Sequence, residues 1–257
     1  MLKHKLIQPL FLLLAISFLL IPHSSWCFFA AYLFLALTYL SVSAYGSYFI
    51  QANYFVDTLH HGDRQQKKIA LTFDDGPQPV FTSKVLDILK EKNVPALFFL
   101  IGQNIAANES DVRRMVAEGH VIGNHSYSHN YWFSLKSADN MVADIKLCDE
   151  EIQRVCGKKP QLFRPPYGVT NPMVARAIKL GNYTGIGWSL RSYDTNAKEA
   201  EGLLNKILSN IKNGDVILLH EWGKHTTAIL PELIDKSRKL GFEFVRADEL
   251  LGVQAYY

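Results

Sequence analysis

The sequence predicts an α/β protein, a distorted (β/α)7 barrel preceded by an N-terminal transmembrane helical hairpin. Two long apolar runs occupy the first 50 residues, and beyond them seven short apolar runs alternate with six amphipathic segments. Such alternation is typical of parallel α/β folds. The unusual polar residues follow the ends of the short runs, and the carboxyl ends of barrel strands meet on one rim. An open doubly wound sheet also fits, but it would gather these residues only near a switch point.

The first 50 residues are predicted to anchor the chain in a membrane. The runs at about 6–22 and 26–50 are each close to the roughly 20 residues that cross a bilayer as a helix. Lys3 and Lys5 also fit the basic start of a cleavable signal peptide, but a second apolar run follows without a small-residue cleavage site. A buried soluble hairpin is a further alternative, which would need an apolar partner surface. We therefore assign residues 1–50 to an anchor, 51–67 to a linker and 68–257 to the main domain.

Two crossings would place both outer ends of the anchor on the same side of the membrane. The connector at 23–25 has no Lys or Arg, whereas the outer ends are flanked by Lys3, Lys5, Arg64, Lys67 and Lys68. The positive-inside rule then predicts that the main domain faces the cytoplasm from a bacterial cell (inner) membrane. If the first run is too short to span, the domain faces outward instead.

The charge balance argues against a nucleic-acid-binding protein. The chain has 27 Lys plus Arg and 24 Asp plus Glu. Lys3 and Lys5 are the only charged residues among the first 50, so 25 basic and 24 acidic residues remain beyond them. A basic face for nucleic acid is not supported by this balance, and the 48% hydrophobic content excludes a disordered chain. The oligomeric state is left open.

The elements of the main domain are predicted from apolar runs and from turn-forming residues between them. The candidate strands are Ile69–Phe73, Ala96–Leu100, His120–Gly123, Gln161–Phe163, Thr184–Gly187, Val216–Leu219 and Glu243–Val245. Capping residues are expected to delimit the helices between them. These are Ser110 and Gly119, Ser137 and Gly157, Asn171 with Pro172 and Gly181, and then Gly214 and Gly241 after two more helices.

Two adjacent carboxylates, Asp74 and Asp75, follow the first strand in the Thr-Phe-Asp-Asp-Gly-Pro segment at 72–77. Neighbouring residues of an extended chain point in opposite directions, so we expect the two carboxylates to have different roles. A pair of turn-capping aspartates is the alternative, because Asp is common in tight turns.

Two histidines, His125 and His129, lie four positions apart after the third strand. We expect one helical turn to bring their imidazoles to the same side. By itself this spacing equally fits two solvent-facing histidines. Together with an aspartate from the first strand, they make a set of two histidines and one carboxylate that leaves coordination positions of a metal open. Hydrolytic metal sites have ligand sets of this kind.

Arg164 and His220 follow the fourth and sixth strands. The Arg-Pro-Pro-Tyr-Gly segment at 164–168 holds a guanidinium able to grip a carboxylate with two hydrogen bonds. His220 ends an apolar strand, where a titratable ring suits proton transfer. An arginine in a structural ion pair and a histidine bonded to a backbone carbonyl are the alternatives.

These motifs, in this order, resemble those of the NodB-homology polysaccharide deacetylases, carbohydrate esterase family 4, over roughly residues 68–251. The resemblance implies that 68–257 is a catalytic domain with the NodB type of (β/α)7 barrel. It also implies a divalent metal, usually zinc, as cofactor. Asp75, His125 and His129 would bind this metal.

The same resemblance implies the roles of the remaining site residues. Asp74 would be the general base, with Arg164 orienting it, and His220 would be the general acid. The backbone amide of Tyr167 would help to hold the oxyanion, and Leu218 would line a small acyl pocket.

One motif departs from the family's pattern. Where the family has an Asp, two residues, then Asp and Trp, residues 191–195 read Arg-Ser-Tyr-Asp-Thr. Arg191 replaces the Asp that normally pairs with the acid histidine, and a cation there should lower the pKa of His220. We expect Asp194 to take over as that partner. Thr195 replaces the Trp, and we expect the pocket wall to include Trp188 or Tyr193.

The implied activity is removal of an N-acetyl group from N-acetylglucosamine or N-acetylmuramic acid in a glycan such as peptidoglycan. Alternatives are a deformylase or deacetylase of a lipid-linked sugar, a carbohydrate O-acetyl esterase, and a sugar-binding module without turnover. The last is the least favoured, because binding needs no base and acid pair. The expected partners are a glycan or lipid-linked sugar and a membrane, and no nucleic acid.

Overall fold

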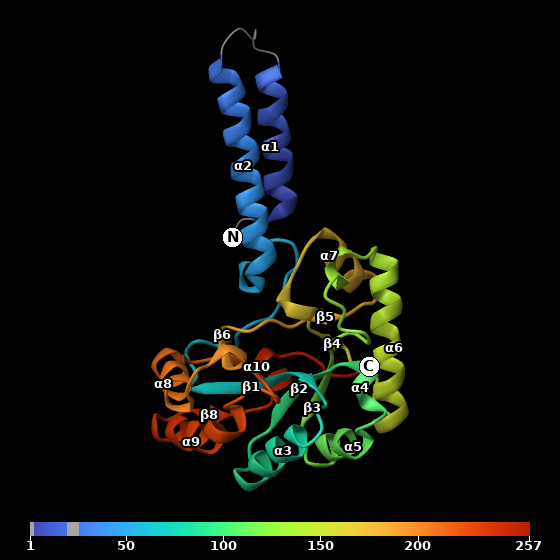
Figure 1. Cartoon of the computed structure of the whole chain (residues 1–257), viewed down its shortest axis with the longest axis vertical. Helices are drawn as coiled ribbons and strands as arrows, with labels where there is room; N and C mark the ends of the chain where they lie inside the picture. The colour runs from blue at the N-terminus through green and yellow to red at the C-terminus, as the bar shows by residue number, and fades with distance from the viewer. Residues whose placement is uncertain (1–2, 20–25) are drawn as a thin grey trace.

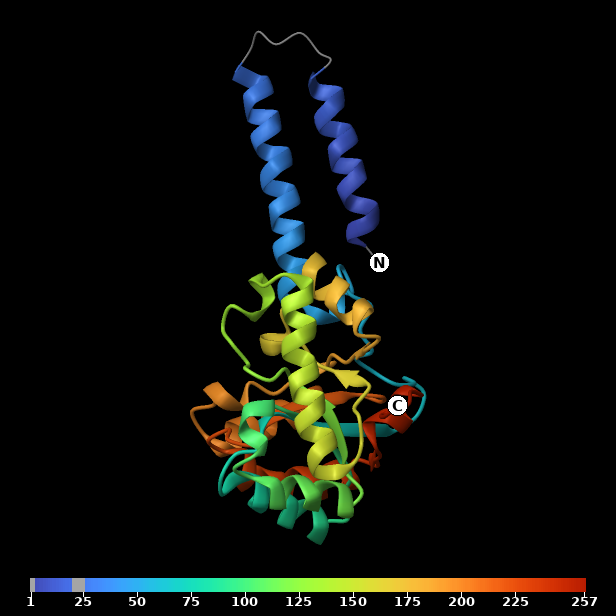
Figure 2. The same cartoon turned by 90° about the vertical axis from the view of Figure 1, so that its right-hand side faces the viewer.

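A computed structural model describes residues 3–19 and 26–257, so the predicted connector at 23–25 lies outside the described residues. The main domain is a parallel sheet curved into a barrel, with helices packed outside it (Figures 1 and 2). The predicted α/β barrel is therefore confirmed.

The N-terminal segment is a helical hairpin that projects from one end of the domain (Figures 1 and 2). It consists of α1 (His4–Leu19) and α2 (Trp26–Tyr48). Apolar side chains on both helices are exposed, including Leu13 at 66% and Phe34 at 73%. Among the described residues, one helical stretch, Phe28–Tyr48, is long and apolar enough to cross a membrane. The apolar part of α1, His4–Ser17, is shorter, so a second crossing stays a prediction.

The sheet follows the order β5-β4-β3-β2-β1-β7-β6, and β8 pairs with β1. Every pairing between these strands is parallel. The strands are β1 (Lys68–Gly76), β2 (Ala96–Leu100), β3 (Val121–Asn124), β4 (Leu162–Phe163), β5 (Thr184–Gly185), β6 (Leu190–Arg191), β7 (Val216–His220) and β8 (Glu243–Phe244). All seven predicted strands are present. The sequence missed β6, because it follows β5 without a helix between them and so is not marked by the alternation of strands and helices.

Helices connect consecutive strands, as the alternation predicts, except between β5 and β6. They are α3 (Phe81–Glu91), α4 (Gly102–Ile105), α5 (Glu109–Ala117), α6 (Ala138–Cys156), α7 (Pro172–Leu180), α8 (Ala200–Asn210), α9 (Thr226–Lys239) and α10 (Ala247–Leu251). Short 3-10 turns add η1 (Ile50–Ala52), η2 (Phe133–Leu135), η3 (Pro166–Gly168) and η4 (Asp194–Asn196). Ser137 and Asn171 cap α6 and α7, each accepting a hydrogen bond from a backbone N–H three residues on. Ser110 does not cap α5, which already begins at Glu109.

The segment expected to be a linker is largely packed against the barrel. Tyr54 and Val56 are buried. Leu59 forms a parallel bridge with Ile186, and His61 forms an antiparallel bridge with Asp215. The longest exposed polar stretch of this segment is residues 63–67, and Asp57 and His61 are exposed as well. The chain from α2 to β1 therefore packs in large part on the barrel.

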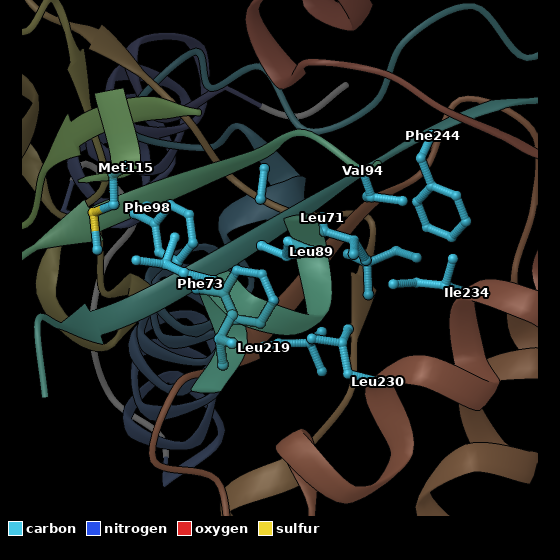
Figure 3. Packing of buried hydrophobic residues seen from close by; sticks show 14 of the residues in the cluster. Leu71, Phe73, Leu89, Val94, Phe98, Met115, Leu219, Leu230, Ile234 and Phe244 are labelled. Carbon is cyan, nitrogen blue, oxygen red and sulfur yellow. The ribbon is translucent and has the colours of Figure 1, made fainter. Parts of the chain in front are cut away.

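The main hydrophobic core lies between the sheet and helices α3, α5, α6, α8 and α9, and Figure 3 shows part of it. Phe73 of β1 and Phe98 of β2 stack with ring centres 5.2 Å apart. Leu219 of β7 packs in the same cluster with Leu230 and Ile234 of α9. Because β1 has neighbours on both sides and apolar residues buried on both faces, it is held firmly where the first site residues follow it.

Two leucines on helices, one buried and one exposed, provide a test of this core. Leu86 of α3 is fully buried, whereas Leu180 of α7 is 54% exposed. Leu86→Ala should lower the free energy of unfolding by about 2–5 kcal/mol, because it leaves a cavity. Leu180→Ala should change it by less than about 0.5 kcal/mol. Urea unfolding of the full chain in detergent measures both, and equal effects would contradict the observed packing.

Candidate active site

A cavity of about 210 Å³ opens where β1, β3 and β7 end. The residues around it come from segments distributed over almost 150 positions of the chain. They are Asp74, Asp75, His125, His129, Tyr167, Gly168, Trp188, Arg191, Thr195, Leu218, His220 and Trp222. The parallel strands thus bring most of the predicted site residues to one rim, as expected for a barrel.

Asp74 is held by the buried guanidinium of Arg164. Arg164 Nη1 donates to Asp74 Oδ1 at 2.6 Å and to Thr72 Oγ1 at 2.9 Å. Its Nη2 and Nε donate to the carbonyl oxygens of Gly187, at 2.7 Å, and Ile186, at 3.2 Å. Arg164 has no exposed surface, so it touches no solvent and no substrate. Its contacts orient Asp74, whose Oδ2 lies 3.8 Å from His125 Nε2.

Asp75 faces the same cavity as Asp74, although extended backbone would have directed the two apart. The expectation of opposite directions fails because Asp75 has φ 70° and the pairing of β1 with β2 shifts register between Asp74 and Gly76. The two carboxylates nevertheless have different contacts. Asp75 Oδ1 lies 3.5 Å from His125 Nε2 and 3.3 Å from His129 Nε2.

The loop with His125 and His129 is not the expected helical turn. Ser126 and His129 have φ 70° and 44°, and the segment has no helix. Polar groups from outside the motif shape it: Asn124 Oδ1 accepts from the Ser126 N–H, and Asp144 of α6 accepts from the Tyr127 and Ser128 N–H groups. The two imidazoles still meet, with ring centres 4.8 Å apart.

Asp75, His125 and His129 form a group that fits a metal ion. One ligand atom from each lies within 4.8 Å of the others. His125 Nδ1 lies 2.7 Å from the Arg164 carbonyl oxygen, which requires it to carry the proton and leaves Nε2 free as a ligand. His129 Nε2 is buried and has no hydrogen-bond partner among the described residues. Burial lowers the pKa of His129 to about 4, so this ring is neutral near pH 7, as metal binding requires.

His220 lies on the opposite wall and pairs with Asp194. Its Nδ1 is 2.9 Å from Asp194 Oδ1, and its backbone N–H donates to Asp194 Oδ2 at 2.6 Å. Burial lowers the pKa of His220, but the hydrogen bond and charge of Asp194 outweigh it, so the net shift is upward. The expected decrease caused by Arg191 is therefore wrong. The Arg191 guanidinium lies over the rings of Trp188 and Tyr193, at 5.5 and 5.0 Å, and is not among the main causes of the pKa shift of His220.

The pocket wall differs in part from the expectation. Leu218 and Trp188 line the cavity and pack together with Ile50 in a small buried cluster. Tyr193 lines neighbouring cavities instead, because its backbone is left-handed with φ 60° and its ring lies beside Arg191 and Lys206. Asp194 is fully buried beneath His220 and does not line the cavity.

Tyr167 lies at the rim with φ 60° and is 48% exposed. Its ring centre is 4.7 Å from that of His129. The structure shows no hydrogen bond from its backbone N–H to another described residue. Gly168 beside it is constrained, because a Cβ there would lie 2.1 Å from the Trp188 ring. The amide of Tyr167 is thus left available for a ligand in the cavity.

Trp222 is a site residue that the sequence reasoning missed. Its Nε1 donates to Asp75 Oδ2 at 3.1 Å, so it binds the carboxylate oxygen that does not face His125 and His129. Gly223 follows it, and a Cβ at that glycine would lie 2.6 Å from Asp194 Oδ2. The sequence feature that could have identified Trp222 is its position, followed by a glycine, two residues beyond the strand that ends in His220.

Comparison with known proteins places these features in a family. The family model described as polysaccharide deacetylase matches residues 61–186. A peptidoglycan-N-acetylglucosamine deacetylase from Bacillus cereus is 36% identical over 191 residues, which cover 72% of this chain and 89% of that protein. A crystal structure of a peptidoglycan N-acetylglucosamine deacetylase has a TM-score of 0.72 and 33% identity, covering 77% of this chain and 94% of that chain.

One structural neighbour is of special interest because it is described as a pseudoenzyme of carbohydrate esterase family 4, from Bacillus anthracis. It has a TM-score of 0.71 and 26% identity and covers 76% of this chain and 69% of that chain. The barrel and its rim thus occur in both deacetylases and a pseudoenzyme. The present chain belongs to the polysaccharide deacetylase family.

The pairing of Asp194 with His220 predicts a change in pH dependence. Asp194→Asn removes the negative charge that raises the pKa of His220, so that pKa should fall by about one unit or more. His220 must be protonated to act as an acid. The loss of turnover at high pH should therefore begin at a lower pH in the variant than in the unchanged protein. Turnover against pH measures this, with the exposed Asp139→Asn as control. An unchanged basic limb would show that Asp194 is not the partner.

Proposed function

We propose that this protein is a metal-dependent hydrolase that removes N-acetyl groups from an N-acetylated sugar in a glycan or in a lipid-linked glycan precursor. One observation carries the proposal: Asp75, His125 and His129 converge in a cavity that also holds Asp74 on one side and His220 on the other. The chemistry of the ligand set suits a divalent metal, and zinc is the metal that we propose.

When bound, the metal supplies Lewis acidity, which lowers the pKa of water and polarises the amide carbonyl. Asp74 accepts the proton of the attacking water through Oδ2, while Arg164 holds Oδ1. The backbone N–H of Tyr167 donates to the oxyanion that develops on the carbonyl oxygen. His220, whose pKa is raised by its hydrogen bond to Asp194, donates its Nε2 proton to the leaving amine. The products are acetate and a free amino sugar.

The shape of the site supports a small acyl group on a sugar. The cavity of about 210 Å³ has an apolar wall, formed by Leu218 and Trp188, that suits a methyl group. At the rim, exposed rings of Tyr131, Trp132 and Tyr167 lie side by side, with centres 4.8 and 5.8 Å apart. Amphipathic aromatic rings at a rim suit the apolar faces of a pyranose.

The base and acid also distinguish this site from a sugar-binding module without turnover. A binding site needs neither the buried arginine that aligns Asp74 nor the buried aspartate that raises the pKa of His220. Both are present here with hydrogen bonds of 2.6 and 2.9 Å. The relative that is described as a pseudoenzyme shows that the fold alone does not decide this question.

The first test of this proposal is release of acetate from N-acetylglucosamine oligomers by the full chain in detergent. Acetate release is expected with zinc, and a chelator should abolish it. Adding zinc back should restore it. Absence of metal-dependent release from every N-acylated and O-acylated sugar tested would contradict the proposal.

Two variants separate metal binding from proton transfer. His125→Ala removes a ligand, so bound zinc measured by mass spectrometry should fall below one tenth per chain. Asp74→Asn keeps the ligand set, so zinc should stay bound while turnover falls by about 100-fold or more. Thermal melting checks folding, because Asp74→Asn leaves the buried Arg164 without its ion pair. Loss of zinc in Asp74→Asn, in a protein that still melts cooperatively, would contradict the division of roles.

We further propose that the hairpin spans the bacterial inner membrane twice and places the domain in the cytoplasm. Contacts at the outer ends support two crossings: Lys3 forms an ion pair with Asp57, and the His4 N–H donates to the Tyr54 carbonyl at 2.9 Å. Both ends of the hairpin thus lie beside the domain (Figure 2).

Alkaline phosphatase fusions test this topology, because that enzyme is active only outside the cytoplasm. A fusion after Tyr257 should be inactive, and a fusion after Ser25 should be active. The opposite pattern would place the catalytic domain outside and contradict the proposed side.

A further inference from the structure

A second cavity lies beside the catalytic one, between β6, α8 and the segment that follows α2. It measures about 390 Å³. Among the described residues of its wall there are four basic side chains and one acid, namely Arg64, Arg191, Lys206, Lys212 and Asp215. The acid is already paired, because Asp215 Oδ1 accepts from Arg64 Nη1 at 2.6 Å. This basic cavity therefore keeps an excess of positive charge.

Three of its cations, Arg191, Lys206 and Lys212, form no ion pair with a carboxylate in the described part of the chain. Arg191 lies over the rings of Trp188 and Tyr193, and Lys206 Nζ lies 4.0 Å from the centre of the Tyr193 ring. Ring contacts of this kind hold a cation in place without neutralising it. Unpaired cations gathered in a concave surface attract an anion.

The basic cavity and the catalytic cavity share Arg191 in their walls. The two cavities are therefore adjacent, with Arg191 between the catalytic cavity and the cations Lys206 and Lys212. The positive charge is local, because residues 51–257 carry 25 basic and 24 acidic side chains. Such a distribution fits a ligand with one compact anionic group better than a polyanion.

The basic cavity also lies close to the anchor. Gln51, three residues beyond the end of α2, belongs to its wall. In Figure 1, β6 lies below the base of α2. The end of α2 is fixed to the catalytic rim, because Ser47 Oγ donates to the Thr170 carbonyl at 2.6 Å. Ile50 packs on Trp188 and Leu218 of the acyl pocket. Both cavities are thus held near the membrane end of the domain.

We propose that the basic cavity binds a phosphate or diphosphate group attached to the acylated sugar, and that this substrate is a phosphate-linked glycolipid of the membrane. The proposal rests on the deacylase function proposed above and names its substrate class. Guanidinium and ammonium groups form charge-assisted hydrogen bonds with phosphate oxygens. The lipid would lie along the hairpin, the phosphate between Arg191, Lys206 and Lys212, and the sugar in the catalytic cavity.

Binding of inorganic pyrophosphate tests the anion site without any turnover. The full chain is placed in nanodiscs of neutral phosphatidylcholine, with a chelator to exclude binding through a metal, and titrated by calorimetry. The double variant Lys206→Gln, Lys212→Gln should raise the Kd about tenfold or more. The control Lys84→Gln, an exposed lysine on α3 at the end of the domain far from the hairpin (Figure 1), should leave the Kd unchanged.

Acetate release in the same nanodiscs then tests the substrate class. The substrates are a neutral N-acetylglucosamine oligomer, uridine diphosphate N-acetylglucosamine and polyprenyl diphosphate N-acetylglucosamine. We expect the highest kcat/KM for the lipid-linked sugar. The preference for diphosphate-linked sugars is their kcat/KM divided by the kcat/KM for the neutral oligomer. The double variant should reduce this preference about tenfold.

The outcomes separate this inference from the deacylase function. Absence of pyrophosphate binding, or an equal Kd in the double variant, would overturn the anion site even if neutral oligomers are deacetylated. A preference for the nucleotide-linked sugar would overturn the membrane source. Lysine-dependent pyrophosphate binding without acetate release from any substrate would support the anion site and overturn the deacylase function.

Discussion

The buried guanidinium of Arg164 is the interaction on which both the barrel and the site depend. A charge without solvent contact is costly unless its donors are satisfied. Here the donors bind Asp74, Thr72 of β1 and the carbonyl groups of Gly187 and Ile186. The guanidinium also lies 4.2 Å from the centre of the Phe99 ring. One side chain thus joins β1 to the segment between β5 and β6 and orients the carboxylate that faces the cavity.

The other site residues are also positioned by polar groups that do not themselves face the cavity. Asp144 of α6 shapes the loop between His125 and His129 through the N–H groups of Tyr127 and Ser128. Asp194 holds His220 and is itself bound by the hydroxyl groups of Ser192 and Thr226. These supporting bonds are 2.8 to 3.1 Å long and buried or partly buried, and they hold the site residues in place before a ligand binds.

The N-terminal hairpin is connected to the active site. The hydrogen bond from Ser47 to Thr170 and the packing of Ile50 on Trp188 join α2 and η1 to the wall of the catalytic cavity. The segment from 53 to 61 then forms part of the barrel wall. The catalytic domain is therefore not tethered through a flexible linker. Its site is held at a defined place relative to α2, which limits the substrates that can reach it.

Local patterns of apolar residues and motifs at strand ends predicted the barrel, the apolar hairpin, every described strand except β6 and most residues around the cavity. They did not predict the left-handed backbone of Asp75, the non-helical loop of His125 and His129, the place of Arg191 over aromatic rings or the contact of Trp222 with Asp75. Only the tertiary structure decided these, and it also decided that the expected linker packs on the barrel. The physical reason is that these features depend on hydrogen bonds and ring contacts between segments far apart in the chain, which no local pattern specifies.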